Sequence, residues 1–157
     1  MQITFGDVIF VVENEKIVLR RFGNVCNDGN NGFVEIQISG ENKNSTMGIK
    51  MVHSSEGERL RYVSHTQTDN RLEIVQRSDL VEVKTVFTAY GDTNAISVYT
   101  ETKNITDSDV VLEEVSSFVL TGFGKKGLDS ASNLYFTRFT QSHHAECQPR
   151  KFSFEQP

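Results

Sequence analysis

The sequence contains no tryptophan, only 2 prolines and only 2 cysteines among its 157 residues. Because proline cannot donate a backbone hydrogen bond to a β-ladder, its absence before Pro149 leaves most of the chain free to form continuous strands. Cys26 and Cys147 are far apart in sequence, and the chain shows no secretory leader. We therefore interpret them as two free thiols rather than as a disulfide or a metal-binding pair.

The sequence also lacks an excess of positive charge and a long apolar run. Its formal net charge is -5, whereas proteins that bind nucleic acid usually carry a basic face. No stretch approaches the roughly 20 apolar residues that a membrane-spanning helix needs. The first residues show no basic region followed by an apolar run, as a signal peptide would. We expect a cytoplasmic protein that binds neither nucleic acid nor a membrane.

What the sequence does contain is an alternation of apolar and polar residues with a period of two, which predicts strands with one buried and one solvated face. Val8, Phe10 and Val12 share one face, and Asn14-Glu15 then forms a tight turn into a second strand over 16–22. Further strands are predicted at 33–39, 71–77, 81–89, 95–103, 110–120 and 134–142. Since two packed sheets are the economical way to bury many such strands, we predict an all-β antiparallel sandwich that forms a single domain over 1–157.

Few residues have the type and spacing that indicate a catalytic or metal-binding site. His143 and His144, with Glu146 and Cys147, form the densest group of potential metal ligands. Neighbouring residues of a strand point to opposite faces, however, and the spacing of a closed zinc site is missing. The acidic residues fall mostly at outward strand positions or in turns, as expected for a solvated surface. We therefore predict no catalytic residue, no metal site and no cofactor.

Several segments, in their order and spacing, resemble the amino-terminal β-supersandwich of family 36 glycoside hydrolases, the α-galactosidases acting on melibiose and raffinose. The resemblance covers nearly the whole chain. The segments that carry it are 60–65, 72–76, 87–90, 98–105, 115–118 and 144–148.

This resemblance implies a galactose-mutarotase-like supersandwich without catalytic residues of its own. In that family the domain precedes a (β/α)8 barrel, whose two aspartates carry out retaining hydrolysis. Neither aspartate lies in the matched region. The chain is then expected to be the amino-terminal part of a longer enzyme whose barrel is absent, and its end at 154–157 agrees with that expectation. The implied partners are the enzyme's own barrel, further copies of the chain and α-galactosides.

The resemblance also suggests four residues as contacts to a sugar, because they are polar or aromatic and lie in or beside the best-matching segments. These are Tyr62, His65, His143 and His144. Many family members carry an aromatic residue where this sequence has His143-His144, so a stacking role there would not be retained.

Two other functions remain open from the sequence. The first is a free-standing carbohydrate-binding β-sandwich, which would read sugars with exposed tyrosines in place of the missing tryptophans. The second is a mutarotase-like enzyme, which would need a histidine and a carboxylate at one sugar ring. The candidate pairs for that enzyme are His65 with Glu73 and His144 with Glu146.

Overall fold

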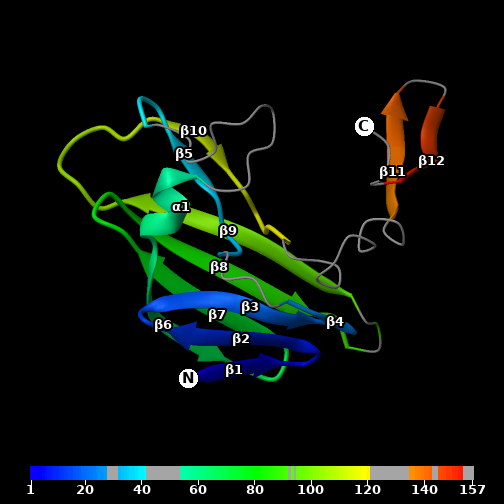
Figure 1. Cartoon of the computed structure of the whole chain (residues 1–157), viewed down its shortest axis with the longest axis horizontal. Helices are drawn as coiled ribbons and strands as arrows, with labels where there is room; N and C mark the ends of the chain where they lie inside the picture. The colour runs from blue at the N-terminus through cyan, green and yellow to red at the C-terminus, as the bar shows by residue number, and fades with distance from the viewer. Residues whose placement is uncertain are drawn as a thin grey trace. The chain divides into compact units, whose positions relative to one another are not determined.

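The computed structural model describes residues 1–27, 32–41, 54–91, 93, 95–120, 135–142 and 145–153. The chain divides into two compact units, Met1–Gly122 and Phe123–Pro157. Both units consist mainly of antiparallel strands, drawn as arrows in Figure 1. The prediction of an all-β sandwich is confirmed.

The first sheet of the larger unit has the order β1-β2-β3-β4. Its strands are β1 (Gln2–Phe5), β2 (Val8–Glu13), β3 (Lys16–Phe22) and β4 (Val25–Cys26). The turn between β2 and β3 is formed by Asn14 and Glu15, whose φ angles are 49° and 64°. Two-residue hairpins of this type need positive φ at both central positions, because their twist then matches that of the strands. The turn expected at Asn14-Glu15 is confirmed.

The second sheet is a meander with the order β6-β7-β8-β9. Its strands are β6 (Arg61–Gln67), β7 (Arg71–Arg77), β8 (Val81–Ala89) and β9 (Ile96–Asn104). Period-two alternation places Leu72 and Ile74 of β7 in the core, fully buried, with Glu73 between them on the wetter face. The strands predicted at 71–77 and 81–89 are confirmed, and the one predicted at 95–103 is displaced by one residue.

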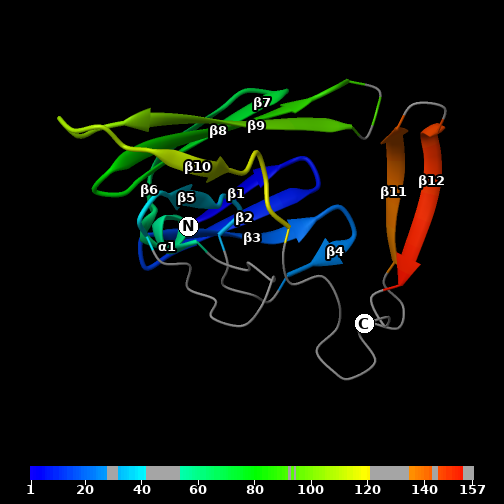
Figure 2. The same ribbon diagram turned by 90° about the horizontal axis from the view of Figure 1, so that it is seen from above.

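The two sheets lie one over the other, as Figure 2 shows most clearly. Phe10 of β2 and Phe87 of β8 approach across the interface with ring centroids 5.2 Å apart, and Phe33 lies 5.0 Å from Phe10. Phe118 contacts Phe33 and Phe87 at 6.1 Å and 5.5 Å. Tilted and edge-to-face rings at such separations attract one another beyond simple area burial. These phenylalanines fill the centre of the core in place of tryptophan.

A third, two-stranded sheet extends the sandwich at one side. It pairs β5 (Ile36–Ile38) with β10 (Leu112–Val115), and the helix α1 (Ser55–Arg59) lies against β5 (Figure 1). The strands predicted at 33–39 and 110–120 are therefore wrong in length, although their segments do lie side by side. Beyond the regular ladder the two segments stay joined, because Ser116 Oγ accepts from the amide of Glu35 at 2.8 Å and the Ser116 amide donates to the Glu35 carbonyl oxygen at 2.9 Å.

The described residues of the smaller unit form a hairpin of β11 (Tyr135–Ser142) with β12 (Ala145–Ser153). The register shifts between Phe139 and Gln141, opposite a stretch in which Cys147 adopts a φ of 56°. Pro149 follows two positions after Cys147 and has no backbone N–H to donate to the ladder, and bulges are among the places where strands tolerate proline. The Lys151 ammonium lies 3.7 Å from the centre of the Tyr135 ring, a cation–π contact. The strand predicted at 134–142 is confirmed to within one residue.

Candidate functional site

Tyr62 and His65 form a hydrogen-bonded pair on β6. Residues three apart on a regular strand point to opposite faces, but the ladder between β6 and β7 shifts register between Tyr62 and Ser64. This bulge absorbs Val63 and returns Tyr62 and His65 to one side of the sheet. The Tyr62 hydroxyl then lies 2.7 Å from His65 Nδ1. The structure therefore brings two of the four suggested sugar-contact residues together.

Tyr62 is held in place through its backbone, and its phenol is partly buried. The Tyr62 amide donates to the carbonyl oxygen of Glu15 at 2.7 Å, which ties β6 to the turn of the first sheet. Burial raises the pKa of Tyr62 above its ordinary value, so the phenol keeps its proton at neutral pH. When His65 carries its proton on Nε2, the phenol donates to Nδ1 and Nε2–H is left to donate to a ligand.

The other suggested contacts, His143 and His144, lie outside the described residues, as does the glycine and lysine segment 122–127. The proposed pair of His65 with Glu73 is not brought together by the sheet. His65 is opposite Ile74, and Glu73 is opposite Thr66, so the two side chains leave opposite faces. Glu73 accepts instead from Arg71 Nε at 2.8 Å.

A hollow of about 320 Å³ opens at the end of the sandwich where the β1–β2, β3–β4 and β8–β9 connections meet. Its walls include the polar residues Asp7, Asn24 and Thr93 and the apolar Phe22 and Ile96. The amide of Gly23 donates to the Asp7 carbonyl oxygen at 3.1 Å and holds two of these turns together. A few polar groups around an apolar wall are what a small polar ligand requires.

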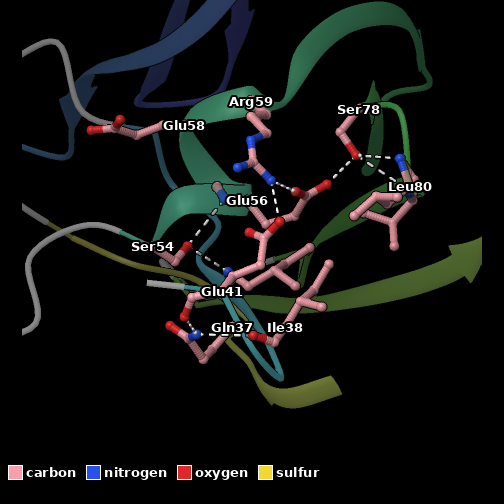
Figure 3. Close-up of polar contacts among 12 residues, drawn as sticks. Gln37, Ile38, Glu41, Ser54, Glu56, Glu58, Arg59, Ser78 and Leu80 are labelled. Atoms are coloured by element: carbon pink, nitrogen blue, oxygen red, sulfur yellow. Dashed lines mark hydrogen bonds and ion pairs between the residues drawn. The ribbon is translucent and has the colours of Figure 1, made fainter. Parts of the chain in front are cut away.

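A polar cluster fastens α1 to the sandwich, and Figure 3 shows its parts. Ser54 is the N-cap of α1, and its buried Oγ accepts from the amides of Gly57 at 3.1 Å and Ile36 at 2.9 Å. The same hydroxyl donates to Glu35 Oε2 at 2.6 Å, and the Ser54 amide donates to that oxygen at 2.7 Å. One serine thus satisfies donors from both the helix and β5.

Glu56 of α1 is fully buried, which sequence reasoning missed because most acidic residues face water. Its carboxylate accepts from Arg59 at 3.1 Å and from the Ser78 hydroxyl, and Arg59 also pairs with Glu41 (Figure 3). The hydrogen bonds of Glu41 and Glu56 raise the pKa of Arg59. Through these partners the buried carboxylate pins the helix to the β7–β8 turn. The available signal was local: a serine cap followed by acidic residues in a first helical turn.

Neither a metal centre nor a membrane span is found among the residues that the structure describes. No group of three or more His, Cys, Asp or Glu side chains there is close enough to hold a metal ion. Within the same residues, no helix has the length and apolar character to cross a membrane.

Comparison with family models, with curated proteins and with solved structures found no match for this chain. The likeness to family 36 glycoside hydrolases therefore rests on the sequence segments alone and remains a prediction.

Proposed function

We propose that this chain is a non-catalytic β-sandwich domain of an α-galactosidase-like glycoside hydrolase, which supports oligomerisation and the rim of the sugar site. The proposal joins two things: the order of the six sequence segments and an all-β sandwich of the expected class. Its cellular place would be the cytoplasm, where Cys26 and Cys147 remain free thiols; both are free and exposed in the structure.

The observation that supports the oligomerisation part of the proposal is the edge strand β9. This strand has nine residues and lies at the border of its sheet, paired with β8. An edge strand of this length presents a row of backbone donors and acceptors that a second chain can pair with. Its exposed side chains include Tyr99 and Glu101, and tyrosine is one of the residue types enriched in protein interfaces.

The association is tested with Tyr99→Lys. A lysine at this position places two like charges close together when two β9 edges pair, which disfavours the dimer. Tyr90→Lys is the matched control, because Tyr90 is similarly exposed but lies in the loop before β9. We expect light scattering to report a dimer or larger oligomer for the native chain and the control, and a monomer for Tyr99→Lys. A native chain that stays monomeric at high concentration would refute the oligomerisation role.

The same purified chain tests the claim that the domain is not catalytic. We expect no release of galactose from melibiose or raffinose by the purified chain. Turnover that follows the chain through successive purification steps, and that is lost when the chain is removed, would contradict the proposal.

One observation favours the second candidate, a free-standing carbohydrate-binding module. The 320 Å³ hollow at the loop end of the sandwich has the size and mixed lining that a single sugar ring needs. Calorimetric titration with galactose, melibiose and raffinose separates the two functions. Saturable binding that Asp7→Ala abolishes would favour the binding module, whereas the supporting domain predicts no heat of binding at millimolar sugar.

A further inference from the structure

Three arginines from three different elements line one hollow of about 420 Å³ at the side of the larger unit. Arg59 is the last residue of α1, Arg61 the first of β6 and Arg77 the last of β7. Ser78 and the exposed Asp79 complete its polar lining.

Each of these guanidinium groups is held by an acceptor of the protein. Arg59 Nη1 donates to Glu56 at 3.1 Å and also pairs with Glu41. Arg61 Nη1 donates to the carbonyl oxygens of Glu58 at 2.8 Å and Leu60 at 3.1 Å. Because a guanidinium has five N–H donors, these contacts leave others for a ligand. A side chain that is already held in place also loses less conformational entropy when it binds.

Arg77 is held in the same way, since its Nε donates to Glu82 Oε2 at 3.1 Å. Arg61 lies directly opposite Arg77 in the β6–β7 register. Like charges at directly opposed positions of a ladder destabilise it, unless a counter-charge lies between them. Glu82 supplies that charge to Arg77, whereas among the described residues no carboxylate pairs with Arg61.

We propose that this hollow binds a small oxyanion, a phosphate or carboxylate group, between Arg61 and Arg77, with Arg59 at its side. Planar guanidinium groups present paired N–H donors that match two oxygens of such an anion. Glu41, Glu56 and Glu82 pair with Arg59 and Arg77, and together with Asp79 at the rim they balance the charge of the arginines, so binding depends on the directed N–H donors. Binding is therefore weak, with a dissociation constant on the order of millimolar, and the affinity falls as the salt concentration rises.

The test is an NMR titration of the 15N-labelled chain, observed at the arginine Nε–H signals. Sodium phosphate and sodium acetate are the probes, with ionic strength held constant by sodium chloride. We expect saturable shifts of the Arg59, Arg61 and Arg77 signals with at least one probe. Arg61→Gln weakens that binding about tenfold or more, as expected for the loss of a charge-assisted contact.

Arg71→Gln is the matched control, because Arg71 lies on the same sheet and pairs with Glu73 as Arg77 pairs with Glu82. It leaves the affinity unchanged. Arg61→Lys keeps the charge but loses the planar fork, so it binds with an intermediate affinity, and it serves if Arg61→Gln perturbs the backbone spectrum. Tighter binding of phosphate than of acetate assigns a phosphate group, and the reverse assigns a carboxylate. Shifts that chloride reproduces, or equal weakening by the variants at positions 61 and 71, overturn the proposal.

Discussion

Replacing Gly57 by alanine is expected to destabilise this protein, although Gly57 lies in a helix. Alanine is favoured over glycine in a helix by about 1 kcal/mol, so propensity alone predicts a gain. A Cβ at this position would lie 2.6 Å from Glu35 Oε2, 2.7 Å from Ser54 Oγ and 3.0 Å from the carbonyl oxygen of Val34. The backbone carbonyl cannot move cheaply, so the Glu35 side chain must leave.

The magnitude follows from the contacts that Glu35 gives up. Its carboxylate accepts two hydrogen bonds from Ser54, at 2.6 and 2.7 Å. A hydrogen bond to a charged group contributes roughly 1.5 kcal/mol at the low end of the measured range. Losing both and subtracting the helix gain of about 1 kcal/mol leaves a net loss of about 2 kcal/mol.

Urea denaturation followed by far-UV circular dichroism measures this difference. Gly32→Ala is the control, because a Cβ there would meet only the Val34 carbonyl oxygen at 3.9 Å, and we expect a change within about 0.5 kcal/mol. Gly57→Ala is then repeated in a Glu35→Ala background, where the nearest obstacle is gone while Ser54 Oγ remains, so part of its cost should vanish. A Gly57→Ala variant that is as stable as the native chain, or a cost unchanged by Glu35→Ala, would refute the steric argument.

Three further outcomes are expected. Glu56→Gln removes the buried charge that accepts from Arg59 and the Ser78 hydroxyl, and should lower the free energy of unfolding by about 2–3 kcal/mol in urea titrations; an unchanged midpoint would contradict a structural role. Phe87→Ala, which empties the centre of the aromatic core, should cost about 3–5 kcal/mol in the same assay, and a cost below 1 kcal/mol would argue against that packing. The hydrogen bond of Arg77 lowers the pKa of Glu82, so the stability from this pair is present above the carboxyl's unfolded pKa and is lost as pH falls through the folded one. Arg77→Gln should return the pKa of Glu82 toward its ordinary value in a 13C NMR titration, and a value that stays low would exclude Arg77 as the cause.

The alternation of apolar and polar residues was sufficient to predict the long strands. β7 and β8 were found at the predicted residues because every second side chain enters one core, as Leu72 and Ile74 do. The turn at Asn14-Glu15 was also predictable, since asparagine favours tight turns, although Glu15 adopts a positive φ that is uncommon for its type.

Short elements were not predictable in the same way. α1 has five residues, too few to show a helical period, and its place depends on Ser54 and Glu56 finding partners in distant segments. The Tyr62–His65 pair depends on a bulge at Val63 that the alternation does not reveal. The three arginines are 2 to 18 positions apart in the sequence, and they line one hollow only because α1, β6 and β7 meet there.

The pairing of β5 with β10 has a kinetic consequence. β1–β4 and β6–β9 connect neighbours along the chain, so their hairpins close short loops and can form early. β5 pairs with β10, which follows the whole second sheet in the sequence, and the Glu35–Ser116 hydrogen bond spans 81 positions. Closing such a loop is the slower step. We expect this seam to form last and to open first, so that its amides exchange with solvent deuterium ahead of those in β7 and β8.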